Sequence, residues 1–342
     1  MSTQSVVKRR PNLFAEMEAR VAEKAASAYG SPKRRFSVIS LFSGCGGMDL
    51  GFKGGFEFLG QKYSRLPFEI VWANDLNEAA CRTYEKNIGE HIVQGDIWKA
   101  METIPQSADV VIGGFPCQDI SVNGKGAGVF GKRSGLNRAM VEIVAKTQPK
   151  IFVAENVKGL LMRHNAESLK RVLADFRGLG YDVTFALYNT AGFGVPQTRE
   201  RVIIVGTHPS AAKFNPPTAI RSKEQYISAR EAIDDLAKMP EKPEFNHVWS
   251  RANKSGEQGN RKLIASRPGY TIRAECHGNI QFHYDLPRRI SMREAARFQS
   301  FPDNFLFDSK LRETERQVGN AVAPVFAWHL ARAVERSLKD KS

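Results

Sequence analysis

Between residues 36 and 206 the sequence alternates short apolar runs with longer stretches of helical periodicity, and this alternation constrains the fold more than any other feature. The apolar runs have the length of strands and end in turn residues. We expect strands at 38–42, 69–73, 110–113, 151–154, 183–187 and 202–205, with helices between them that include 77–87, 136–147 and 166–179. This order predicts an α/β fold with a doubly wound, mostly parallel sheet and helices on both faces.

The regular alternation stops after Gly206 and resumes near Ser291. The stretch between them is rich in Pro, Lys, Arg, Asn and Gly, which predicts a second, smaller, loop-rich domain over residues 207–286. Ser291 and Glu294 have the spacing of a capping box at the start of a helix over 291–299, and another helix is expected over 324–338. We therefore divide the chain into a basic helical extension (1–35, with a helix over 12–28), an α/β domain (36–206), a loop-rich domain (207–286) and C-terminal helices (287–342).

The charge of the chain favours a polyanionic partner. Its 342 residues hold 50 Lys and Arg against 36 Asp and Glu, a formal net charge of +14. Such a balance attracts nucleic acid by counterion release and steering, although charge alone can also serve solubility. Hydrophobic residues make up 42% of the chain, enough to build a packed core rather than a disordered segment.

The cysteines suggest a reducing compartment. Cys45, Cys81, Cys117 and Cys276 are scattered without C-x-x-C pairs or nearby histidines, so neither a zinc site nor a disulfide framework is expected. The sequence has no apolar run of signal-peptide or membrane-spanning length. We expect a cytoplasmic monomer with no membrane partner and no metal.

A glycine turn and two carboxylates predict a nucleoside pocket. Gly44, Gly46 and Gly47 follow the first expected strand, where glycines let the backbone approach a ligand, but Asp49 replaces the third glycine of a dinucleotide motif. Asp75 ends the second strand and is suited to both hydroxyls of a ribose. Asp96 follows the next element and is suited to an adenine amino group. At successive strand ends, the two carboxylates outline an adenosyl pocket.

Cys117 is the candidate nucleophile. It follows the strand at 110–113 in the run Gly-Gly-Phe-Pro-Cys-Gln, at the carboxyl-terminal edge where open α/β sheets bind ligands. Pro116 fixes the preceding turn, and the glycine-rich segment 124–128 has the composition of a mobile lid. The other three cysteines read as small buried hydrophobes.

Three charged side chains complete the candidate site. Glu155 ends the strand at 151–154, where apolar neighbours would favour its protonated form and allow it to donate a proton. Arg199 and Arg201 precede the strand at 202–205 and supply planar donors for a base edge or a phosphate. Each feature taken alone is more often a helix cap, an ion pair or a solvated face, so the assignment depends on their occurring together.

Together these residues resemble the cytosine-C5 DNA methyltransferase family of the bacterial restriction-modification type. The family's motifs occur in order: G-F-P-C-Q at 114–118, E-N-V at 155–157, Q-x-R-x-R at 197–201 and Q-V-G-N-A-V at 317–322. The run at 289–302 is similar to the element that braces the family's recognition domain. The resemblance covers residues 36–338, less closely at 207–286, and implies a Rossmann-like methyltransferase fold.

The resemblance implies that Cys117 attacks C6 of a flipped-out cytosine while Glu155 contacts N3 and Arg201 contacts the base, with Gln118 and Arg199 in the same catalytic set. S-adenosylmethionine would be the cofactor. The positions that match cofactor contacts are Phe42, Gly44, Gly46, Gly47, Asp75, Leu76, Asp96, Ile97, Pro116, Asn320 and Val322. Ser40 is a departure, because many relatives carry an acidic residue there, and it affects how the methionine moiety is held.

Other functions remain open at this point. An RNA cytosine methyltransferase could use the same catalytic residues, because they do not read the 2′-OH; the size of region 207–286 favours double-stranded DNA. A catalytically dead regulator would lack Cys117 or Glu155, and both are present. A nicotinamide oxidoreductase would leave Cys117 and Glu155 unexplained. A cognate restriction endonuclease could act on the same site without contacting this chain.

Overall fold

The computed structural model describes residues 35–115, 135–252, 260–274 and 280–339. Pro116, Cys117, Gln118, the segment 124–128, Lys254, Cys276 and the expected helix at 12–28 lie outside these ranges. Residues Phe36–Ser342 form one compact unit, which contains every element below. The divisions expected at 206 and 286 remain predictions.

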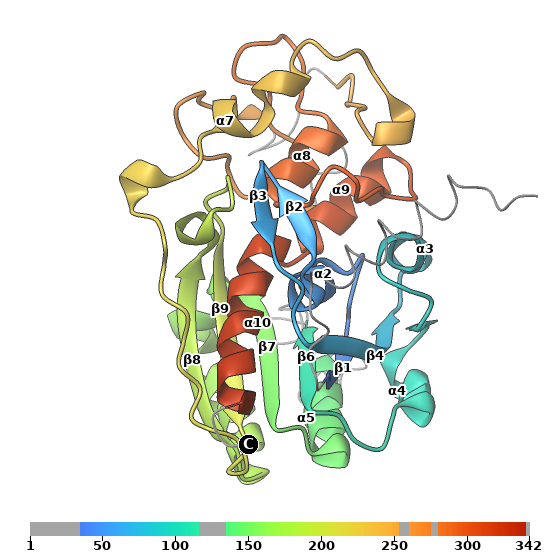
Figure 1. The fold of residues 1–342 in the computed structure, drawn as a ribbon, viewed down its shortest axis with the longest axis vertical. Helices are drawn as coiled ribbons and strands as arrows, with labels where there is room; N and C mark the ends of the chain where they lie inside the picture. Colours follow the sequence, from blue (N-terminus) through green and yellow to red (C-terminus); the bar gives the residue numbers. More distant parts are fainter. Residues whose placement is uncertain (1–34, 116–134, 253–259, 275–279, 340–342) are drawn as a thin grey trace, which may run out of the picture. The chain divides into compact units, whose positions relative to one another are not determined.

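The central sheet has seven strands in the order β5-β4-β1-β6-β7-β9-β8 (Figure 1). Pairing is parallel from β5 through β7, whereas β9 runs antiparallel to both β7 and β8. The strands are β1 (Phe36–Leu41), β4 (Phe68–Asp75), β5 (Ile92–Gln94), β6 (Val110–Gly114), β7 (Ile151–Val157), β8 (Asp182–Asn189) and β9 (Glu200–Thr207). The predicted mostly parallel α/β sheet is confirmed.

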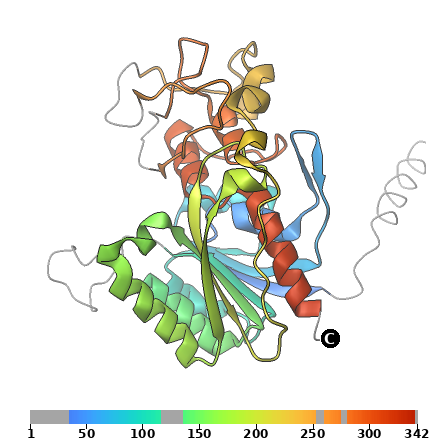
Figure 2. The ribbon, with the colours of Figure 1, turned by 90° about the vertical axis from the view of Figure 1, so that its left-hand side faces the viewer.

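Helices cover both faces of the sheet, as a doubly wound fold requires (Figure 2). One face packs against α4 (Ile97–Ala100), α5 (Leu136–Thr147) and α6 (Ala166–Gly178). The opposite face packs against α2 (Gly47–Lys53), α3 (Glu78–Asn87) and α10 (Pro324–Lys339). None of the helices in the described ranges is long and apolar enough to cross a membrane.

Local capping signals explain where several helices begin. The Asn77 side chain accepts a hydrogen bond from Ala80 N at the start of α3. Ser291 and Glu294 form the predicted capping box at α8 (Met292–Phe298): Glu294 N donates to Ser291 Oγ at 3.0 Å, and Ser291 N donates to Glu294 Oε2 at 2.7 Å. Both starts are therefore confirmed.

A short hairpin lies between α2 and β4 in the chain. It pairs β2 (Phe56–Phe58) with β3 (Gln61–Tyr63). The Tyr63 ring meets the edge of Trp328 at a centroid distance of 5.4 Å, and Trp328 Nε1 donates to the carbonyl oxygen of Ser64 at 2.9 Å. The hairpin is thus fixed to α10.

Helix α10 lies directly against α2. A Cβ atom on Gly51 would be 2.4 Å from Ala327 Cβ, and one on Gly47 would be 2.4 Å from the carbonyl oxygen of Val322. Only glycine permits this approach at either position. The C-terminal Gln-Val-Gly-Asn motif, at the end of α9 (Leu311–Asn320), is thereby brought beside the first glycine turn.

Arginines on and before α8 brace the loop-rich region, in which α7 (Ala229–Ile233) is a short helix. Arg289 donates to the carbonyl oxygens of Ala252 and Ile280. Arg293 donates to those of Phe245, Pro302 and Phe305. These side chains are almost fully buried, so each unmade bond would leave a buried polar group unsatisfied.

Candidate active site

Glu155 and Arg201 form a buried ion pair at one end of the sheet. Arg201 Nε lies 2.7 Å from Glu155 Oε1, and the two side chains are 11% and 10% exposed for Arg201 and Glu155 respectively. Glu155 lies in β7 and Arg201 in β9, which pair antiparallel. Sequence reasoning anticipated apolar neighbours for Glu155; the structure adds this cation. The carboxylate therefore lies against a cation before any substrate binds.

The chain approaches Cys117 alongside Glu155. Gly114 pairs with Glu155 between the parallel strands β6 and β7, and a Cβ atom on Gly114 would be 3.0 Å from Glu155 Oε2. Phe115 is buried, and its carbonyl oxygen accepts a hydrogen bond of 3.0 Å from Asn156 Nδ2. Cys117 itself lies outside the described residues, two positions further along the chain.

The glycine turn after β1 is bonded to the end of β4. Gly44 N donates to Asp75 Oδ2 at 2.8 Å, and Asn77 N donates to Asp75 Oδ1 at 2.8 Å. Burial raises the pKa of Asp75, although these two N–H groups stabilise its charged form. Phe42 and Gly46 adopt positive φ angles of 53° and 90°, so the turn follows a path that favours glycine.

The other expected cofactor residues within the described ranges follow β4, begin α4 or belong to the C-terminal run 317–322. Gly95 N donates to the carbonyl oxygen of Asp75 at 2.9 Å, which brings Asp96 beside β4. The Asp96 side chain caps α4 by accepting from Trp98 N at 2.9 Å. Leu76 is 74% exposed and Ile97 is 3% exposed. From the C-terminal motif, Val322 contacts the turn through Gly47, and Asn320 is exposed at the end of α9.

Arg199 is placed differently from Arg201. It is 1% exposed, and its guanidinium donates to the carbonyl oxygens of Ile272, Gly319 and Ala321. Sequence reasoning puts Arg199 among the catalytic donors, but these three bonds direct it into the protein rather than toward a base. The two arginines of the Q-x-R-x-R motif therefore have different partners: Arg201 pairs with the Glu155 carboxylate, and Arg199 donates to backbone carbonyl oxygens.

Sequence reasoning missed a role for Gln197. This buried side chain accepts from Ile272 N at 2.9 Å and donates to the carbonyl oxygen of Phe298 at 3.0 Å and to Gln299 Oε1 at 2.6 Å. It links residues distant in sequence, so no local pattern reveals the contacts. The one feature of the sequence that could have indicated a role for Gln197 is its place as the first residue of the Q-x-R-x-R motif.

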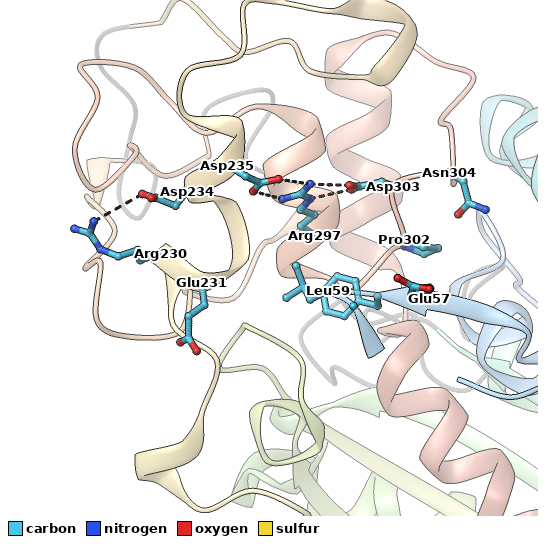
Figure 3. Close-up of a pocket in the computed structure, with 12 residues that line it drawn as sticks. Glu57, Leu59, Arg230, Glu231, Asp234, Asp235, Arg297, Pro302, Asp303 and Asn304 are labelled. Carbon is cyan, nitrogen blue, oxygen red and sulfur yellow. Dashed lines mark hydrogen bonds and ion pairs between the residues drawn. The ribbon is translucent and has the colours of Figure 1, made fainter. Parts of the chain in front are cut away.

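A hollow of about 820 Å³ lies between the β2–β3 hairpin and α7. Figure 3 shows Arg297 there, held by Asp235 and Asp303 at distances of 2.9 and 2.8 Å. Carboxylates outnumber cations in its lining, which includes Glu57, Glu231, Asp234, Asp235 and Asp303 against Arg230 and Arg297. A negative wall disfavours a phosphate backbone, and none of the candidate site residues lines it. This hollow is therefore not assigned to the candidate active site.

The chain is similar in sequence to a defined family and to named relatives. The family model for C-5 cytosine-specific DNA methylase matches residues 36–263 and 249–336. The type II methyltransferase M.NgoFVII of Neisseria gonorrhoeae is 36% identical, over 91% of this chain and 89% of that protein. The type II methyltransferase M.FnuDI of Fusobacterium nucleatum is 33% identical, over 89% of this chain and 95% of that protein.

Solved structures share the fold. A putative DNA modification methyltransferase from an Escherichia coli prophage superposes with a TM-score of 0.62 at 22% identity, covering 89% of this chain and 99% of that one. The Dnmt2 methyltransferase of S. pombe gives a TM-score of 0.64 at 19% identity, covering 88% and 99% of the two chains.

The chain belongs to the C-5 cytosine-specific DNA methylases. It is a DNA (cytosine-5-)-methyltransferase of the kind found in restriction-modification systems.

Proposed function

We propose that the enzyme transfers a methyl group from S-adenosylmethionine to C5 of a flipped-out cytosine within a specific double-stranded DNA sequence, through a covalent bond between Cys117 and C6. The observation that carries this proposal is the Glu155–Arg201 pair, 2.7 Å apart, beside the strand that leads to Cys117. A carboxyl group beside the strand that precedes a cysteine in the sequence suits addition to a pyrimidine ring, because the carboxyl group can handle a proton while a thiol adds to carbon.

The glycine turn fits an adenosyl cofactor. A Cβ atom on Gly44 or Gly95 would meet no atom within 4 Å, so open space lies beside both residues. Asp75 borders this space with a carboxylate suited to ribose hydroxyls, and exposed Leu76 offers an apolar surface to a purine ring. Phe42, Gly46, Gly47, Asp96, Ile97, Pro116, Asn320 and Val322 would complete the site.

In the proposed mechanism, Cys117 adds as a thiolate to C6, and the electrons displaced from the C5–C6 bond move toward C5 and N3. A proton shared between Glu155 and N3 neutralises that charge, and Arg201 orients the carboxyl group and contacts the base. S-adenosylmethionine would supply an electrophilic methyl group to the electron-rich C5 and leave as S-adenosylhomocysteine. Transfer of the C5 proton to water would then let the C5–H electrons re-form the C5–C6 double bond, which expels Cys117 as a thiolate and restores the aromatic ring.

The base must leave the duplex for this chemistry, because neither C5 nor C6 is accessible to a protein pocket from within the stack. We assign sequence reading to residues 207–286, where Arg251, Arg261, Lys262, Arg267 and Arg273 are all exposed. Gln118, next to the nucleophile in the sequence, would belong to the same catalytic set. We further propose a cytoplasmic monomer, with any cognate endonuclease acting on the same site without binding this chain.

Bisulfite sequencing tests the proposal directly. DNA from cells that express the chain should carry 5-methylcytosine at one short sequence, and DNA from cells expressing Cys117→Ser should not. Total RNA from the same cells should be unmodified above background. Methylation of RNA but not of DNA would instead establish the RNA methyltransferase alternative.

A further inference from the structure

The guanidinium group of Arg199 joins two segments that the proposed function assigns to different ligands. Its Nη1 donates to the carbonyl oxygen of Ile272 at 2.9 Å, within the proposed recognition region. Its Nη2 donates to the carbonyl oxygens of Gly319 at 2.7 Å and Ala321 at 3.2 Å, which flank the proposed cofactor residue Asn320. Because Arg199 is 1% exposed, bulk water does not replace these bonds.

Two glutamines make a second connection between the same segments. Gln197 accepts from Ile272 N at 2.9 Å and donates to Gln299 Oε1 at 2.6 Å. Gln299 Nε2 in turn donates to the carbonyl oxygen of Ala321. Both backbone groups of Ile272 are thus connected to residues 319–321, the carbonyl oxygen through Arg199 and the N–H through Gln197 and Gln299.

The two segments also touch directly through their backbones. A Cβ atom on Gly319 would lie 2.5 Å from Ala274 N and 2.6 Å from the carbonyl carbon of Arg273. At this separation no side chain fits between them. A shift of either segment must therefore move the other.

We propose that Arg199 is a positioning residue that couples cofactor binding to DNA binding. A bound cofactor orders Asn320 and Val322, which fixes the carbonyl groups of Gly319 and Ala321. Those groups fix the guanidinium, and the guanidinium fixes Ile272 and the recognition segment that continues from it. The coupling is reciprocal, so DNA must tighten cofactor binding by the same factor. This inference rests on the proposed function.

The test measures a coupling ratio on the full chain, defined as the Kd of S-adenosylhomocysteine alone divided by its Kd in the presence of DNA. Calorimetry gives the Kd of S-adenosylhomocysteine alone and in the presence of a short duplex that contains the site found by bisulfite sequencing. The wild-type ratio should be at least about 5-fold, the lower end of typical allosteric coupling. In Arg199→Met the ratio should fall toward 1, because only the connection through Gln197 and Gln299 and the backbone contact at Gly319 remain. Arg199→Lys should give an intermediate ratio, because an ammonium group cannot reproduce the guanidinium's fixed fork of donors.

Arg293→Lys is the matched control. Arg293 is also fully buried and also donates to three carbonyl oxygens, those of Phe245, Pro302 and Phe305. None of these three residues lies in the C-terminal run 317–322 that contains the proposed cofactor residues. This variant should lose thermal stability and keep the wild-type ratio. If Arg199→Met does not fold, a comparison of the coupling ratios of Arg199→Lys and Arg293→Lys decides whether Arg199 carries the coupling.

Three results would overturn the inference: a wild-type ratio of 1, Arg199 variants that keep the wild-type ratio, or an equal loss of coupling in Arg293→Lys. The last would show that general loosening, rather than Arg199, changes the ratio. Failure of the proposed function looks different, because the wild-type chain would then neither bind S-adenosylhomocysteine nor methylate cytosine.

Discussion

Arg201 Nε lies 2.7 Å from Glu155 Oε1, so an arginine on an antiparallel strand is paired with the carboxyl group proposed to meet the cytosine ring. Glu155→Gln keeps the shape of the side chain but cannot transfer a proton. We expect its kcat to fall by roughly 10²–10⁴-fold, the usual contribution of a general acid or base. Single-turnover methyl transfer to duplex DNA measures this directly. A loss of less than about threefold would remove Glu155 from the mechanism.

Cys117→Ser should abolish methyl transfer and leave S-adenosylmethionine binding nearly unchanged, because the thiol is proposed to attack the base and not to hold the cofactor. Cys45→Ser is the control. Cys45 is 1% exposed, and burial raises the pKa of its thiol well above its usual range, so it stays protonated and unreactive. Calorimetry and methyl transfer on both variants check the assignment. Substantial turnover by Cys117→Ser would contradict it.

DNA with 5-fluorocytosine at the target should trap the covalent intermediate. Fluorine cannot leave C5 as a proton does, so Cys117 stays attached to C6 after methyl transfer. A denaturing gel should show a shifted protein–DNA band that requires S-adenosylmethionine and is absent with Cys117→Ser. If an otherwise active enzyme gives no such band, the covalent route is wrong.

Exchanging residues 207–286 for the matching region of a relative with another target should move the methylated site. Within this region, replacing a residue that contacts phosphate should weaken binding to all sequences and reduce the salt slope by about one unit, whereas replacing a base-reading residue should relax one position at a cost of roughly 1–3 kcal/mol. Exposed Arg261 and Arg273 are the first residues to test. A hybrid that still methylates the original site would place recognition outside residues 207–286, and the segment after Gln118 would be the next to exchange.

The buried carboxyl of Asp49 predicts a dependence of stability on pH. Burial raises the pKa of Asp49 from 3.8 to about 6, while the Tyr84 hydroxyl donates to its Oδ1 at 2.9 Å. The folded state therefore holds this proton more tightly than the unfolded state, and stability is lost as pH rises from about 4 to about 6. Asp49→Asn should remove that loss, so its free energy of unfolding relative to wild type should increase by ~1–3 kcal/mol across this interval. Urea unfolding at pH 4.5 and pH 7 measures the free energies of unfolding of both proteins. If the variant differs from wild type by the same amount at both pH values, Asp49 does not ionise within the fold over this interval.

Local sequence signals were enough to predict most elements of the fold. Asn77 and Ser291 cap their helices through atoms three residues away, so the pattern alone identifies both starts. The short strand β5 and the β2–β3 hairpin were not predicted, because each strand has only three residues and none shows a clear period. The hairpin depends instead on its contact with Trp328, far along the chain.

The candidate site was harder to predict than the fold. The motifs singled out Glu155 and Arg201, but their contact requires β9 to pair with β7, and hydrophobic periodicity does not reveal pairing partners. The same limit applies to Arg199. Its motif suggested a donor for the substrate, whereas its partners Ile272, Gly319 and Ala321 come from two distant segments that only the folded chain brings together.

The close packing of α10 on α2 also sets the order in which the enzyme can mature on the ribosome. Gly47 and Gly51 are synthesised early, but the residues they contact, Val322 and Ala327, emerge only near the other end of this sequence. At roughly 5–20 residues per second, tens of seconds separate the two segments during translation. A nascent chain therefore cannot bring these segments together, or complete the proposed cofactor pocket, while residues 207–286 are still being made.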